Sequence, residues 1–251
     1  TIIGFVIGIA AAVGFVVVEL RREHPLLDVR LFRNEGLTTG SVNLFVVFAL
    51  MFAIFLILVQ FLQAVLGYTA LHAATGLLPM AVMMMPLSTV APTIAHKVGY
   101  RRTVVTGMLI LAAGLTLLAL LADADRGYLS ILPGLLLIGA GVGLAMSPST
   151  TAITSSLTED KQGVASALND TVREIGAAMG LALVGSILNS QFRNNITDLA
   201  NSYPPETAAR IKEGIGGALS TAAQLGPNGQ PLVSAARNAY VDGMKPALLI
   251  A

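Results

Sequence analysis

Long uncharged stretches alternate with short charged segments along the whole sequence. The first stretch ends at Glu19, and no Asp, Glu, Lys or Arg occurs between positions 36 and 95. The hydrocarbon core of a bilayer is about 30 Å thick, and a helix needs about 20 apolar residues to cross it. The stretch 36–95 is therefore long enough for two crossings, and Gly67-Tyr68-Thr69 separates them. This pattern predicts a series of membrane-spanning helices.

The charged segments set the expected ends of each helix. The uncharged stretch from Ile175 to Leu188 is only about 21 Å long as a helix, so this helix must begin earlier, between Gly163 and Ser166, to cross the core. We expect helices at 1–20, 38–62, 73–95, 103–122, 128–151, 166–190 and 239–251, the first and last of them partial, with a loop at 21–37 and a long polar segment at 191–238.

Composition supports the same class. The 251 residues are 55% hydrophobic and 12% charged, whereas soluble domains carry about 25% charged residues. Cysteine is absent, which excludes disulfides and thiolate metal sites, and the net charge of +1 indicates no nucleic-acid partner. Because the sequence starts and stops inside apolar stretches, we expect a fragment of a longer membrane protein, truncated at both ends.

Lysine and arginine alternate between dense and sparse connections. The sparse connections hold no basic residue around 63–72 and only Arg126 around 123–127. Short loops rich in positive charge stay in the cytoplasm, so we place the dense connections inside and 191–238 outside. There, TAARIKEGIGGALSTAAQL (207–225) predicts a partly amphipathic helix that acts as a solvated cap. The dense connections hold Arg21, Arg22, Arg30 and Arg33, then Lys97, Arg101 and Arg102, and then Lys161 and Arg173.

Small residues recur at helical spacing in two of the expected helices. Glycines four residues apart let two helix backbones approach closely, which is a main source of helix association in lipid. Static packing is the simpler interpretation, and a pair of helices that rocks is the functional one, since glycine and proline also weaken a helix. The residues are Gly139, Gly141, Gly143 and Pro148 in GLLLIGAGVGLAMSPST (134–150), and Gly176 and Gly180 in GAAMG (176–180).

A few polar and soft side chains within the helices are candidates for lining a cavity. Polar groups in a membrane usually face the bundle interior or water, and methionine suits a poorly selective apolar site. Interfacial anchoring is the simpler interpretation of the glutamines, and core packing explains the methionines equally well. The candidates are Asn43, Gln60, Gln63, Met83, Met84 and Asn169.

Three charges stand together at the inner end of the sixth helix. Asp170, Arg173 and Glu174 are three and four positions apart, so they share roughly one helix face. A lone charge deep in a membrane helix costs about 2.5–3.5 kcal/mol, so we expect pairing and an inward-facing position. Two interpretations stay open. One is an Asp170–Arg173 pair at the interface, and the other is a cytoplasmic-side charge lock between two helix bundles, made in one access state and broken in the other.

The sequence offers little support for an enzyme. His24, His72 and His96 are far apart, and no metal-ligand spacing, nucleophile motif or phosphate-binding loop is present in the sequence. An intramembrane enzyme would need a cluster of His or acidic residues at one membrane face. We therefore expect no catalytic residue, no metal and no cofactor.

Several longer segments carry a family resemblance. They are VVELRREHPLLDVRLFRN (17–34), LVQFLQAVLGYTALHAATGLLP (58–79), GLLLIGAGVGLAMSPS (134–149), GVASALNDTVREIGAAMGLALVGSIL (163–188) and NAYVDGMKPALLIA (238–251). In this order they resemble the 14-helix drug:proton antiporters of the major facilitator superfamily, over essentially the whole chain. The resemblance implies an all-α integral membrane fold in which 1–20 is a central linker helix and 38–251 is the C-terminal six-helix bundle.

A loop segment is similar to the second, degenerate copy of the superfamily's loop motif. In PTIAHKVGYRRTVV (92–105), Lys97, Gly99, Arg101 and Arg102 match the motif, while His96 stands where the motif has an acid. Gly99 permits a tight turn, and the basic cluster holds that turn at the cytoplasmic surface. Without the carboxylate, anchoring of the topology is sufficient to explain the loop.

The resemblance also implies a function. Such proteins export hydrophobic, often cationic compounds in exchange for protons by alternating access, driven by the proton gradient. The partners would be the small-molecule substrate, protons and membrane lipid, with no nucleic acid, and the full-length protein would be a monomer in a bacterial plasma membrane. The coupling carboxylates would lie in the N-terminal bundle. Alternatives are export of a lipid or an endogenous metabolite on the same fold, and a non-transporting receptor or scaffold.

Overall fold

The computed structural model describes residues 2–21, 29–124 and 126–250. Within these residues every regular element is a helix or a helical turn and no strand occurs, which confirms the predicted all-α fold. The long helices are α1 (Ile2–Arg21), α2 (Glu35–Gln60), α4 (Leu78–Val98), α5 (Tyr100–Leu121), α6 (Leu132–Ser155), α7 (Gln162–Ala200) and α10 (Gln230–Ile250), and the short ones are α3 (Ala70–Gly76), α8 (Pro205–Lys212) and α9 (Ile215–Gln224). A π-helical turn (Phe61–Val65) extends α2, and 3-10 turns lie at Val29–Arg33, Tyr128–Ser130, Glu159–Lys161 and Gly226–Gly229.

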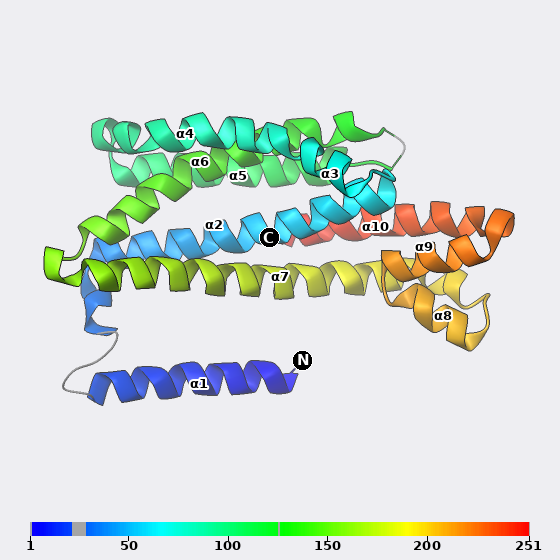
Figure 1. The fold of residues 1–251 in the computed structure, drawn as a ribbon, viewed down its shortest axis with the longest axis horizontal. Coiled ribbons are helices and arrows are strands. Elements are labelled where there is room, and N and C mark those ends of the chain that lie inside the picture. The colour runs from blue at the N-terminus through cyan, green and yellow to red at the C-terminus, as the bar shows by residue number, and fades with distance from the viewer. Residues whose placement is uncertain (1, 22–28, 125, 251) are drawn as a thin grey trace.

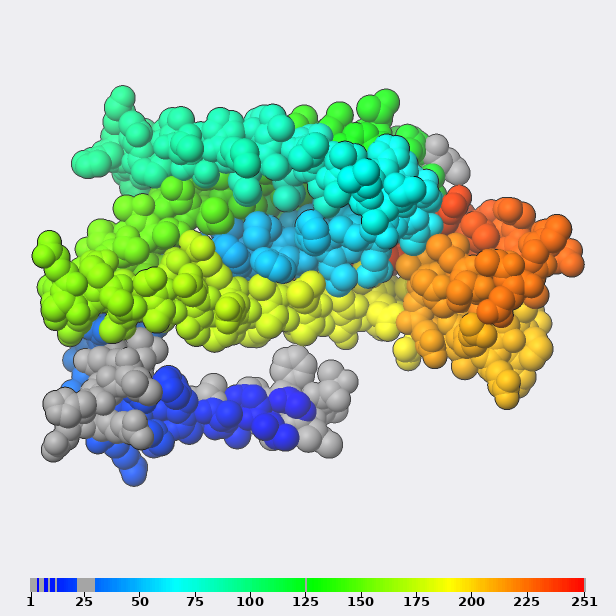
Figure 2. Space-filling view, in the orientation of Figure 1, coloured from blue at the N-terminus to red at the C-terminus, as the bar shows by residue number. Residues whose placement is uncertain are grey.

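The long helices lie side by side, with α6 in the middle of the bundle. Helix α6 packs against α4, α5 and α2, whereas α7 packs against α2 and α10. Figure 1 shows α8 and α9 at one end of the bundle and the α4–α5 and α6–α7 connections at the other, and Figure 2 shows α1 set apart from α7 over most of its length. Residues 22–28 of the predicted loop 21–37 lie outside the described residues, and the rest of it holds the 3-10 turn Val29–Arg33 and the first residues of α2, which begins at Glu35.

Five helical segments in the described residues are long and apolar enough to cross a membrane. They are Glu35–Val65, Ala70–Val98, Tyr100–Leu121, Leu132–Ser155 and Glu159–Ala200. The expected crossing at 239–251 is not among them. Helix α10 begins earlier, at Gln230, and carries Arg237, Asp242 and Lys245.

The long helix α7 is the largest departure from the predicted boundaries. We expected a helix at 166–190 followed by a polar extracytoplasmic segment at 191–238, but α7 continues to Ala200. The reason is a buried stripe at four-residue spacing, which packs against the α8–α10 region and keeps this polar stretch helical. The stripe is Leu188, Phe192, Ile196 and Ala200.

The helix expected at 73–95 is broken near its start. Thr69 caps α3, because its side-chain oxygen accepts a hydrogen bond from the His72 amide, and a new helix, α4, starts just before Pro79. The Gly76 carbonyl at the end of α3 accepts a hydrogen bond from the Tyr128 hydroxyl at 2.7 Å. Burial and the neighbouring Tyr68 raise the pKa of Tyr128, so this hydroxyl keeps its proton and holds α3 against the turn that leads into α6.

Glycines on α6 face two different neighbours. A Cβ added at Gly139 would collide with the Met80 carbonyl of α4, and one at Gly143 would lie 2.7 Å from the Met84 carbonyl. On the adjacent face, a Cβ at Gly141 would lie 2.5 Å from the Leu111 amide nitrogen of α5. The backbone of α6 therefore touches the backbones of α4 and α5 directly.

A second glycine seam joins α7 to α2. A Cβ at Gly176 would lie 2.5 Å from the Phe45 carbonyl, and a Cβ at Gly180 would collide with the Ala49 carbonyl. A rocking pair of the two glycine-bearing helices was the functional interpretation of this spacing, but the glycines of each helix make their close contacts with other helices. Close packing inside the bundle is what these residues provide.

Replacing Gly180 by alanine tests the seam between α2 and α7. The added methyl group cannot fit against the Ala49 carbonyl, so Gly180→Ala should destabilise the folded protein by about 1–3 kcal/mol, as overpacking does. The measurement is the thermal unfolding midpoint of the purified full-length protein in detergent. Gly163→Ala on the same helix is the control, because a Cβ there meets no atom within 4 Å. Equal midpoints for both variants would contradict the close approach.

Candidate functional site

Arg173 lies half-buried in the first half of α7, where its side chain contacts α2 and α6. One terminal nitrogen, Nη2, donates a hydrogen bond to Thr150 Oγ1 of α6 at 3.1 Å. The guanidinium carbon lies 5.1 Å from the centre of the Phe48 ring of α2, a cation–π contact worth about 0.5–2 kcal/mol. We call Arg173, Thr150, Phe48, Asn169 and Asp170 the Arg173 cluster.

No carboxylate of the described residues pairs with Arg173. The ion pairs Asp123–Arg126 and Asp242–Lys245 lie elsewhere, and the Asp170–Arg173 pair, one of the two interpretations left open by the sequence, is not formed. The guanidinium turns toward α2 and α6, while the Asp170 and Glu174 side chains are exposed. Asp170 Oδ1 instead accepts a hydrogen bond from Asn169 Nδ2 at 3.4 Å.

Two polar atoms of the Arg173 cluster are buried without a hydrogen-bond partner. They are Arg173 Nε and Asn169 Oδ1, and the Asn169 residue is only 8% exposed. A buried polar atom left unpaired costs about 1–3 kcal/mol. The cluster therefore offers one donor and one acceptor, beside a positive charge, to a further polar group.

Pro148 explains how α6 reaches this cluster. Figure 1 shows that the last part of α6 leaves α4 and α5 and leans toward α7. Proline inside a helix removes one backbone hydrogen bond and bends the helix, and Pro148 lies two residues before Thr150. The Thr150 hydroxyl donates to the Met146 carbonyl at 3.2 Å and uses its oxygen to accept from Arg173.

The predicted loop motif lies at the turn between α4 and α5. Gly99 has φ +101°, a conformation that favours glycine, and it joins the two helices without an intervening loop. The side chains of Lys97, Arg101 and Arg102 are exposed. Asn43 Nδ2 of α2 donates to the Tyr100 hydroxyl at 3.2 Å, so Asn43 ties α2 to this turn, beside a groove that Arg101 also lines.

Gln60 and Gln63 line a cavity of about 540 Å³ at the other end of the bundle. Its walls come from α2 and its π-helical turn, α7, the α8–α9 connection and α10. We call it the cap cavity; it is lined by Leu56, Val59, Gln60, Gln63, Ala64, Gly185, Leu188, Asn189, Phe192, Glu213, Gly214, Ile215, Gly216, Gly217 and Tyr240. The other predicted lining residues, Met83 and Met84, lie half-buried on α4, and Met84 packs against the core.

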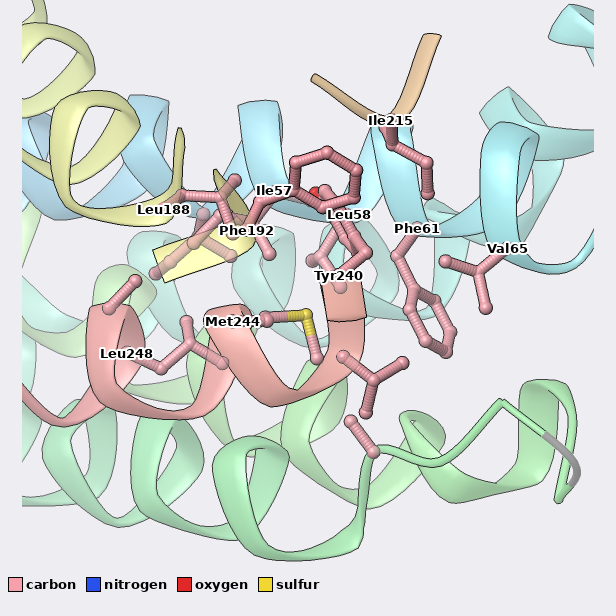
Figure 3. Close-up of a cluster of buried hydrophobic side chains, with 14 of the residues drawn as sticks. Ile57, Leu58, Phe61, Val65, Leu188, Phe192, Ile215, Tyr240, Met244 and Leu248 are labelled. Carbon is pink, nitrogen blue, oxygen red and sulfur yellow. The ribbon is translucent and has the colours of Figure 1, made fainter. Parts of the chain in front are cut away.

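Several residues at these two sites escaped the sequence analysis. Phe48 and Thr150 gave no signal, because an aromatic and a threonine are ordinary in a membrane helix. Tyr240 is 1% exposed and donates its hydroxyl to the Ile57 carbonyl at 2.9 Å, so it ties α10 to α2. Figure 3 shows it among the apolar side chains of that core. Glu213 lay in a segment interpreted only as a solvated cap.

Several known proteins are similar to this chain in sequence. The Major Facilitator Superfamily model matches residues 1–181. The multidrug transporter protein MdtP of Bacillus subtilis (strain 168) is 29% identical over 79% of this chain and 37% of its own length. The multidrug efflux pump LfrA of Mycolicibacterium smegmatis is 31% identical over 98% of this chain and 49% of its own length.

A third relative is the cephamycin export protein CmcT of Amycolatopsis lactamdurans, 33% identical over 78% of this chain and 41% of its own length. The chain thus spans half or less of the length of each of these relatives. All three are named as transport or export proteins, and the family match covers most of the helices described above. The chain belongs to the Major Facilitator Superfamily, and its long apolar helices indicate a multi-pass membrane protein.

Proposed function

We propose that this chain is the C-terminal half of a proton-coupled multidrug efflux transporter that works by alternating access in a bacterial plasma membrane. Its substrates are hydrophobic or cationic small molecules, and the proton gradient supplies the energy without a cofactor. The relatives named as multidrug transporters support the substrate class. The observation that carries the mechanism is Arg173, a half-buried cation with no carboxylate partner among the described residues.

A charged side chain within a membrane helix marks function when its burial is not compensated locally. Thr150 and Phe48 compensate Arg173 in part, but its Nε remains unpaired. A carboxylate on another part of the full-length protein would pair with Arg173 in one access state and separate from it in the other. Such a contact, made in only one state, is what lets substrate or proton binding shift a two-state equilibrium.

Export of an endogenous metabolite is the second candidate. CmcT is named for cephamycin export and has the highest identity of the three relatives described above. The same fold serves unrelated substrates, and the Arg173 cluster would operate in the same way for either cargo. A comparison of metabolites accumulated in the medium by wild-type and deletion strains separates this candidate from drug export.

Dye export tests the function directly. Everted membrane vesicles containing the full-length protein should accumulate ethidium when a proton gradient is imposed, because efflux in the cell is uptake in this geometry. An ionophore that collapses the gradient should abolish the accumulation. Transport that is unaffected by the ionophore would contradict proton coupling, and no movement of any hydrophobic cation would contradict drug export and favour a scaffold.

Removing the charge of Arg173 tests its proposed role. Arg173→Gln should slow dye export by about fivefold to a hundredfold, the range of a coupling free energy of 1–3 kcal/mol, while protein level and thermal stability stay near wild type. Arg173→Lys, which keeps the charge, should restore part of the rate. Arg193→Gln is the control, because Arg193 is exposed farther along the same helix. If Arg173→Gln lowers only protein level, the residue is structural and the charge lock does not exist.

A further inference from the structure

The cap cavity has apolar walls fixed by the core. In Figure 3, Leu188 and Phe192 of α7, Ile215 of α9 and Tyr240 of α10 lie around the end of α2. All four line the cavity. The hydroxyl of Tyr240 donates its hydrogen bond to the Ile57 carbonyl. Tyr240 therefore contributes its aromatic ring, and no free donor, to the cavity wall. These walls suit the apolar body of a ligand.

The charge in the lining of the cap cavity is negative. Gln60, Gln63 and Asn189 contribute amides, and Glu213 contributes a carboxylate. None of the described lining residues is Lys, Arg or His. The neighbouring Lys212 is held elsewhere, because its Nζ donates to Asn201 Oδ1 at 2.7 Å. A carboxylate beside apolar walls and neutral amides favours a cation over an anion.

Bare backbone forms the wall on the α8–α9 side. Gly214 has φ +153°, which favours glycine, and a Cβ at Gly217 would collide with the Arg210 carbonyl. At Gly216, by contrast, an added Cβ would meet no atom within 4 Å. The absence of side chains here helps to leave a volume of about 540 Å³, which falls within the roughly 300–1,000 Å³ of sites for drug-sized ligands.

We propose that the cap cavity is a binding site for a hydrophobic organic monocation. The positive charge lies beside Glu213, the amides of Gln60 and Gln63 contact the polar edge, and the apolar body covers Phe192 and Ile215. Because the charge pattern places α8 and α9 outside the cell, this inference rests on the proposed export function and gives the substrate an outer subsite on the route of release.

Tetraphenylphosphonium, a lipophilic monocation, is the probe. Its binding to the purified full-length protein in nanodiscs of neutral lipid is measured by equilibrium dialysis. Glu213 is exposed at the cavity, so Glu213→Gln should weaken binding to one class of site by up to about fivefold, the upper range for one exposed ion pair. Gly216→Leu should remove one equivalent of bound probe, because Gly216 lines the cavity and an added Cβ there meets no atom within 4 Å, so the new side chain takes up cavity space. Neutral triphenylphosphine oxide should bind equally to the wild type and Glu213→Gln.

Glu206→Gln is the matched control, because Glu206 is an exposed carboxylate of the same cap outside the cavity lining. It should bind tetraphenylphosphonium as the wild type does. If Glu213→Gln and Gly216→Leu also bind as the wild type does, or the wild type binds no probe, the cavity is not a cation site, even where dye export is normal. If both variants lose binding as expected while the wild type exports no dye, the site stands and the proposed function falls.

Discussion

The packing of backbone against backbone at a few glycines is the constraint on which the rest of the bundle depends. In lipid, apolar side chains gain little by leaving hydrocarbon for protein, so helices associate through close contact and interhelical hydrogen bonds. Gly139 and Gly143 bring α6 onto α4, Gly141 brings it onto α5, and Gly176 and Gly180 bring α7 onto α2. A methyl group at any of these positions would push two backbones apart. The bundle is therefore one closely packed unit, and movement is expected at its faces and ends rather than between these helices.

The positions of the two candidate sites are set by α2 and α7, which both run the length of this bundle. Both helices are longer than the hydrocarbon core requires, so they extend from the Arg173 cluster at one end to the cap cavity at the other. At the first end, the last part of α6 leans toward α7, and its Thr150 accepts a hydrogen bond from Arg173. At the second, the buried stripe of α7 continues under α8 and α9 and supplies Phe192 to the cavity wall.

The features that follow from hydrophobic periodicity and composition could be predicted from the sequence. The features that depend on contacts between helices could not. The all-α membrane fold and the presence of close-packed helices followed from uncharged stretches and glycine spacing. The helix that each glycine contacts could not be predicted, because glycine spacing indicates a close approach but does not identify the neighbouring helix. The end of α7 was placed too early, because the polar residues after Leu188 obscured a stripe at Phe192, Ile196 and Ala200 that only the cap buries. The Asp170–Arg173 pair was wrong because the position of Phe48 and Thr150, which turn the guanidinium inward, carries no signal along the chain.

The central claim is that the environment of the Arg173 cluster changes between access states. These 251 residues contain no cysteine, so Asp170→Cys places a single thiol among them, within the cluster at an exposed position of α7. The measurement is the rate at which a membrane-impermeant maleimide labels this thiol from the cytoplasmic side in the full-length protein. The account predicts that the rate changes several-fold when tetraphenylphosphonium or a proton gradient is present. Equal labelling rates in all conditions, in a protein that transports, would contradict it.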